Sequence, residues 1–122
     1  MGISENIKKN IEENIDLLLQ KEIIYIAKNK REKWTERYAA MQIIDRDEPE
    51  GLKALIDIAI NDNKWIMRNG ARQRIDQNTV EGQEAIFYIF EHSKYPSSKK
   101  ELRPIVKNLK NGKKNIDNKL EI

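Results

Sequence analysis

Two arginines stand 31 residues apart, and each follows a tryptophan by three positions: Arg37 follows Trp34, and Arg68 follows Trp65. A guanidinium is a planar fork of donors that can hold two acceptors at once. An indole offers a large flat surface that suits contact with a peptide or stacking on a nucleic-acid base. These side chains therefore predict packing or binding rather than bond-making chemistry.

The arginines have two interpretations. Their repetition at one spacing favours a structural ladder, in which each guanidinium bridges to an acid or a backbone carbonyl between stacked helices. The predicted ladder consists of Arg37, Arg68, Asp45, Asp62 and Asp76. In the other interpretation, Arg68 and Arg72 lie one turn apart on the same helical face and each neutralises a phosphate.

The tryptophans also have two interpretations. Packing of each indole against the preceding turn is the simpler one, and a pair of exposed indoles on one ridge is the functional one. The candidate partner-binding residues are therefore Trp34, Trp65, Arg68 and Arg72.

Side chains that enzymes use are sparse in this sequence. There is no cysteine, and His92 is the single histidine. The chain has no glycine-rich phosphate loop, no serine nucleophile elbow and no spaced set of metal ligands. Acidic pairs such as Asp45 and Asp47 suit turns better than acid–base chemistry. We therefore predict a non-enzymatic protein without catalytic, cofactor-binding or metal-binding residues.

The arginines and tryptophans belong to a longer repeat. Identical residues recur at the single offset of 31 residues, without a gap, and ten of these pairs are Lys33/Lys64, Trp34/Trp65, Arg37/Arg68, Ala40/Ala71, Ile44/Ile75, Asp45/Asp76, Glu50/Glu81, Gly51/Gly82, Ala54/Ala85 and Ile58/Ile89. A period of this length is typical of helical solenoids, whose stacked units together bury a core that no single unit can bury.

Apolar periodicity predicts the helices that must position these side chains, over residues 4–13, 15–28, 33–45, 48–60, 65–76, 79–92 and 98–111. Asp47 and Asn78 are the predicted N-caps of two of them, because Glu50 and Glu81 follow three residues later, as in a capping box. Residues 18–26 are apolar on nearly all sides, which predicts an interior helix.

The second copy resembles the second helix of a HEAT repeat of the short, thirty-residue type. The matching pattern is Asp62, an apolar residue before Arg68, Ala71 three residues on, and Ile75 four further. Residues 52–59 are similar to the first helix of that repeat.

The first copy matches less well, because Glu36 stands where an apolar residue precedes the arginine. The resemblance covers residues 16–92, about two and a half units, and it implies an all-α fold: a short right-handed α-solenoid of antiparallel helix pairs with about six or seven helices. Residues 1–111 would form one HEAT-like domain with a repeat core at 16–92 and a capping helix at 98–111, followed by a flexible basic tail at 112–122. Proteins of this type serve many functions, so the resemblance selects no activity.

Charge is unevenly distributed along the chain. Residues 34–93 hold seven basic and eleven acidic side chains, whereas residues 94–122 hold nine basic and three acidic ones. We predict a scaffold that binds a protein partner; the alternative is a nucleic-acid-binding protein that uses Arg68, Arg72 and the basic C-terminal segment. Without cysteine, a leader or a long apolar run, we expect a cytoplasmic protein that does not enter a membrane.

Overall fold

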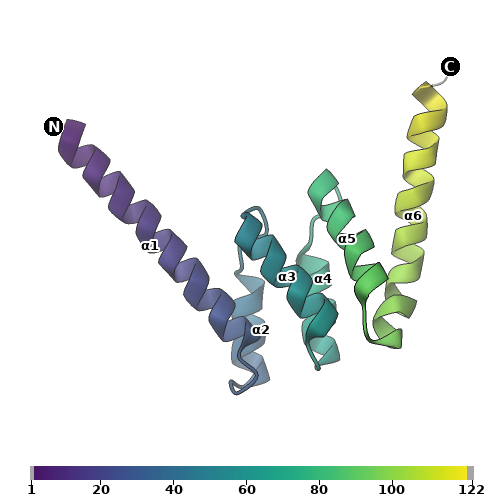
Figure 1. Ribbon diagram of the computed structural model, residues 1–122, viewed down its shortest axis with the longest axis horizontal. Coiled ribbons are helices and arrows are strands. Elements are labelled where there is room, and N and C mark those ends of the chain that lie inside the picture. The colour runs from purple at the N-terminus through teal and green to yellow at the C-terminus, as the bar shows by residue number, and fades with distance from the viewer. Residues whose placement is uncertain (1, 121–122) are drawn as a thin grey trace. The chain divides into compact units, whose positions relative to one another are not determined.

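The computed structural model describes residues 2–120, apart from the side chains of residues 2–4, 6, 8, 10–15, 17 and 113–120. Its backbone forms six helices over this range (Figure 1): α1 (Gly2–Lys28), α2 (Trp34–Gln42), α3 (Pro49–Asn61), α4 (Trp65–Arg74), α5 (Val80–His92) and α6 (Pro96–Leu120). No strand occurs in this described range, so the predicted all-α class is confirmed. None of the helices described is long and apolar enough to span a membrane.

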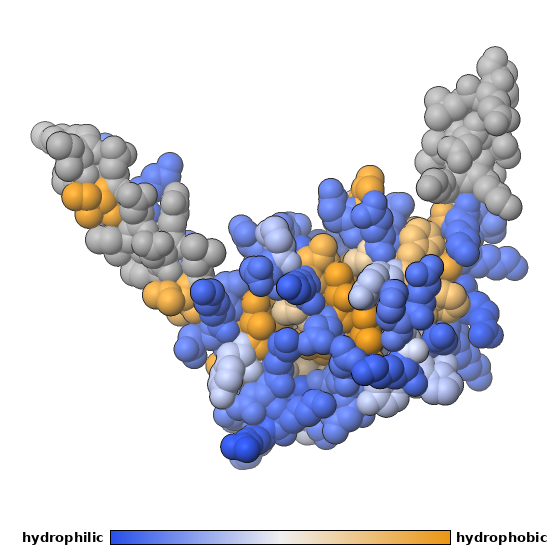
Figure 2. Space-filling model, viewed as in Figure 1, coloured by the Kyte–Doolittle hydropathy of each residue, from blue (hydrophilic) through white to orange (hydrophobic). Residues whose placement is uncertain are grey.

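The chain divides into two compact units, Met1–Ala54 and Leu55–Ile122, here called the N-terminal and the C-terminal unit. The division falls inside α3. In the N-terminal unit α1 packs on α2, and in the C-terminal unit α5 packs on α6. Hydrophilic residues cover most of the visible surface over α4 to α6, with apolar residues showing between the helices (Figure 2). The single domain proposed for residues 1–111 stays a prediction.

Helix α1 differs from its prediction in two ways. It is one continuous helix where two were predicted, and Leu18 and Leu19 are exposed rather than interior. The cause is the length of its neighbour: α2 has nine residues and spans about 14 Å, whereas the 27 residues of α1 span about 40 Å. Ala27, in the last turn of α1, is fully buried, and a helix as short as α2 can cover no more than about a third of the length of α1.

The 31-residue period of the sequence is also a period of the structure. Helices α2 and α4 begin at the equivalent residues Trp34 and Trp65, and α3 and α5 begin at the equivalent residues Pro49 and Val80. Equivalent residues are buried in both copies, among them Arg37/Arg68, Ala40/Ala71, Ile44/Ile75, Ala54/Ala85, Leu55/Ile86 and Ile58/Ile89. The repeat therefore encodes the same pattern of burial twice.

The turn before α5 is capped by a different residue from the one predicted. Thr79 is the N-cap, and its hydroxyl oxygen accepts from the backbone N–H of Gly82 at 2.9 Å. Asn78 lies one residue too early, where its backbone N–H donates to Asp76 Oδ1 at 2.9 Å. Asp47 likewise stands two residues before the first residue of α3 and donates its backbone N–H to an aspartate. The prediction of Asp47 and Asn78 as N-caps was wrong.

Two repeated glycines allow these helices to start close to the preceding turn. A Cβ atom on Gly51 would overlap the backbone carbonyl of Asp45, and one on Gly82 would overlap that of Asp76. The close approach of backbone to backbone explains why both copies carry glycine here.

Helix α6 begins earlier and extends further than predicted. It starts at Pro96, a residue that suits the first turn of a helix, so Ser98, where the predicted helix began, lies inside it. Pro104 lies within the helix, and the backbone continues as helix to Leu120. The side chains of residues 113–122 lie outside the described part of the chain, and the flexible tail predicted for 112–122 stays a prediction.

Candidate functional site

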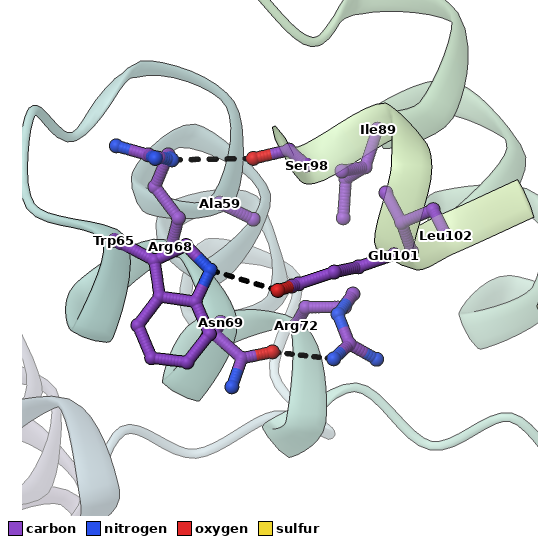
Figure 3. A pocket seen from close by; sticks show the side chains of 9 residues that line it. All are labelled: Ala59, Trp65, Arg68, Asn69, Arg72, Ile89, Ser98, Glu101 and Leu102. Carbon is purple, nitrogen blue, oxygen red and sulfur yellow. Dashed lines mark hydrogen bonds between the residues drawn. The ribbon is translucent and has the colours of Figure 1, made fainter. Parts of the chain in front are cut away.

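Arg68 is buried in the C-terminal unit and makes polar contacts on several sides. Its Nη1 donates to the carbonyl oxygen of Asp62 at 2.9 Å. Its Nε donates to Ser98 Oγ at 3.2 Å, as Figure 3 shows. Its Nη2 lies 3.5 Å from Ser97 Oγ, and its guanidinium carbon lies 3.8 Å from the ring centre of Tyr95. The guanidinium thus ties the turn before α4 to the start of α6.

Arg37 has an equivalent place in the N-terminal unit. It is almost completely buried, and its Nε donates to the carbonyl oxygen of Ala27 at 3.1 Å. Ala27 is in the last turn of α1 and Asp62 directly follows α3, so each arginine bonds to a carbonyl at the end of the preceding helix. Such carbonyls have no hydrogen-bond donor within their own helix, so a bond from an arginine stabilises the helix end.

The three aspartates of the predicted ladder lie in turns. Asp45 Oδ1 accepts from the backbone N–H two residues later at 3.0 Å, and Asp62 and Asp76 do the same at 3.0 and 2.9 Å. Asp62 also reaches Arg68 through its backbone carbonyl. A ladder that joins stacked helices through all five residues stays a prediction.

The two tryptophans are about half exposed, 45% for Trp34 and 49% for Trp65. The indole Nε1 of Trp65 donates to Glu101 Oε1 at 2.9 Å, which connects α4 to α6 (Figure 3). Each indole therefore combines a fixed position at the start of a helix with a face that a partner can reach.

Arg72 occupies an unusual position for a cation. In the repeat it is equivalent to Met41, which is completely buried. Burial lowers the pKa of Arg72, and the nearby Glu101 carboxylate offsets part of this effect. Its guanidinium also donates to Asn69 Oδ1. Arg72 is therefore partly a core residue and not a fully solvated phosphate-binding side chain.

Trp65, Arg68 and Arg72 come together where α4 meets α6 (Figure 3). The space they enclose with their neighbours is only about 10 Å³. A volume of this size holds about one water molecule at most, so this cluster fills a contact between helices and leaves no room for a ligand.

The N-terminal unit has a larger groove of about 650 Å³, here called the acidic groove. Residues of α1 form one side, and residues of the turn before α3 and of its first turn form the other: Asp16, Gln20, Lys21, Ile24, Asp45, Glu48 and Glu50. Sequence reasoning missed this site, because it assigned Asp45 to a turn and to the ladder, and Glu50 to a capping box.

The C-terminal unit has a second groove of about 320 Å³ between α5 and α6, here called the basic groove. Its residues are Phe90, Arg103, Val106, Lys107, Lys110 and Asn111. Its three cations belong to the basic C-terminal segment that the sequence singled out.

His92 and the acidic residues form no metal centre within the described part of the chain, where no group of three or more potential ligands converges. The ring of His92 stacks on that of Tyr88 at 4.0 Å, and its Nδ1 lies 2.9 Å from the Tyr88 carbonyl oxygen. Both contacts lie within α5, which indicates a structural role for His92 in this helix.

Comparisons of the chain with protein-family models, with curated proteins and with solved structures found no match.

Proposed function

We propose that the chain is a non-enzymatic protein-binding module whose partner contacts an exposed apolar stripe on α1. The stripe consists of Ile7, Leu18 and Tyr25, which are 54%, 62% and 66% exposed. Their separations of 11 and 7 residues correspond to about three and two helical turns, so all three lie on one face of the helix. This stripe is the observation that carries the proposal.

Exposure of large apolar side chains to water is unfavourable in free energy, and a partner that buries them removes this unfavourable term. Burial of apolar surface contributes about 25 cal/mol per Å². Single exposed apolar residues are ordinary, but an aligned set on one helix is typical of a surface that packs against another helix. Leu19, which is 55% exposed, widens the stripe on one side.

A pull-down from source cells tests this proposal. Leu18→Glu combined with Tyr25→Glu places charges in the stripe without disturbing the core, so the variant should fold normally and lose the captured partner. Ile43→Glu is the matched control, because Ile43 is 63% exposed in the same unit but lies outside α1. Capture that is unchanged by the double substitution would refute the proposal.

We propose further that the two copies are successive units of a short, right-handed, HEAT-like α-solenoid. Three repeated features support it: the burial of the arginines, the glycines at the start of α3 and α5, and the tryptophans that open α2 and α4. A cytoplasmic location also remains a proposal, supported by the absence of cysteine from the sequence.

The alternative function is nucleic-acid binding, which the basic groove favours. Arg103, Lys107 and Lys110 are exposed and follow one another at four and three residues along α6, so they share one face. Arg68 contributes less to this alternative, because its donors are already bonded within the C-terminal unit.

Salt dependence tests the alternative. Binding of a short single-stranded or duplex DNA should weaken steeply as salt rises above about 50 mM, since phosphate contacts release counterions. Deletion of residues 111–122 removes Lys113, Lys114 and Lys119 and should make the slope shallower by about 2–3. Absence of measurable binding at about 50 mM salt would remove this function.

A further inference from the structure

The acidic groove has a strongly negative rim. Asp16, Asp45, Glu48 and Glu50 are all exposed, and Lys21 is the one cation among the lining residues. At neutral pH these five side chains carry a net charge of −3. The groove therefore favours a positively charged occupant.

The groove also offers contacts that suit a polypeptide. Ile24 provides an apolar surface against which the aliphatic part of a lysine or arginine side chain can pack. A volume of about 650 Å³ lies in the range of specific binding sites.

We propose that the acidic groove binds a lysine- or arginine-bearing segment of a partner protein through its four exposed carboxylates. This inference rests on the proposed protein-binding function and adds the chemistry of the partner. The stripe on α1 and the groove have no residue in common, and positions 20 and 24 lie about 100–160° around the helix from positions 18 and 25.

The repeat supplies a matched control for the groove. Glu50 and Glu81 both stand in the first turn of their helices, where a carboxylate interacts favourably with the positive helix end. Only Glu50 lines the groove. Replacement of either glutamate by lysine should therefore lower stability to the same extent, while only the Glu50 change should affect binding.

Two labelled 14-residue peptides serve as probes, one composed of Lys, Leu and Ala and the other with Glu at every Lys position. Fluorescence anisotropy should show that the full chain binds the Lys peptide at least about tenfold more tightly than the Glu peptide. Binding should weaken between about 50 mM and 500 mM salt, because exposed charges are screened.

The variants then locate the site. Glu50→Lys should weaken binding of the Lys peptide about tenfold, and Glu81→Lys should change it less than about twofold. Asp16→Lys, on an exposed position of α1, should act like Glu50→Lys without affecting a helix start.

Several results would overturn the inference. They are equal binding of both peptides, no binding of the Lys peptide, or equal effects of Glu50→Lys and Glu81→Lys. Salt-sensitive self-association in sedimentation, abolished by Glu50→Lys, would make a second copy the occupant and would also overturn it. A partner whose capture depends on Leu18 and Tyr25 but not on Glu50 would refute the groove alone and leave the proposed function intact.

Discussion

Arg68 is a structural residue by its contacts, and its removal should be costly. Arg68→Ala would remove the hydrogen bonds that Arg68 donates to the Asp62 carbonyl and the Ser98 hydroxyl, together with the contact with Tyr95. Buried polar groups that lose a partner cost about 1–3 kcal/mol each, so we expect a loss of about 2–3 kcal/mol in urea unfolding. Arg74→Ala, at the partly exposed end of α4, should cost about 1 kcal/mol or less. Equal losses would contradict the structural assignment.

Replacement of Arg72 by methionine, the residue at the equivalent position of the other copy, should not destabilise the fold. Because Met41 fills the equivalent core position, Arg72→Met keeps the shape and removes the cost of partly burying a charge. We expect thermal unfolding to show a gain of about 1 kcal/mol, at the low end for such replacements because the guanidinium is partly in water.

The reverse substitution checks this interpretation. Met41→Arg places a charge at a fully buried position and should cost roughly 3 kcal/mol or more. A loss of stability in Arg72→Met would show that the contacts of Arg72 with Asn69 and Glu101 outweigh its desolvation.

Repetition predicts which residues share a role, but not which atoms they contact. The spacing of Arg37 and Arg68 indicated a common structural position, and both are buried. Their partners were not predictable, because Ala27 O and Ser98 Oγ lie 10 and 30 residues away along the chain. Sequence pattern carries no information on which distant polar groups remain unpaired after helices pack.

At the scale of elements, the two glycines that open α3 and α5 should tolerate no side chain. Gly51→Ala and Gly82→Ala gain helix propensity, but each new Cβ would overlap a backbone carbonyl that cannot move independently. We expect both to lose about 1–3 kcal/mol in urea unfolding. Gly112→Ala is the control: it lies within α6 with open space around it and should gain about 1 kcal/mol. Neutral results at the first two positions would contradict the close approach.

The positions of the helices were predicted better than the exposure of their side chains and the residues that cap them. Periodicity identifies an apolar face, yet it does not give the length of the neighbour that covers it, and for that reason the exposure of Leu18 and Leu19 was missed. Capping signals were misassigned by one residue, since Asn78 and Thr79 both suit an N-cap and only the turn geometry chooses Thr79.

At the scale of the whole molecule, the sequence predicted a repetitive helical chain but neither groove. The acidic groove joins residues 16–24 of α1 to residues 45–50, which are more than 20 positions away. Its acids were individually interpretable as caps and surface charges. Their meaning as one negative site arises only from the packing of α1 beside the start of α3, which no local pattern encodes.

If the two copies are units of a solenoid, the chain should accept a third. Residues 34–64 comprise one full period, from the first residue of α2 to the residue before α4. A tandem duplication of this segment places Lys64 before a second Trp34 and preserves the register of every repeated position. In a solenoid each unit contacts only its neighbours, so an added unit contributes its own core and one more interface. The extended chain should keep its fraction of helix by circular dichroism and unfold cooperatively, at or above the melting temperature of the parent.

A duplicate of residues 65–95, which carries Arg72 in place of Met41, should stabilise less. Loss of helix or of cooperative unfolding in the first duplication would mean that the repeat is confined to sequence and local burial, and that the copies do not stack.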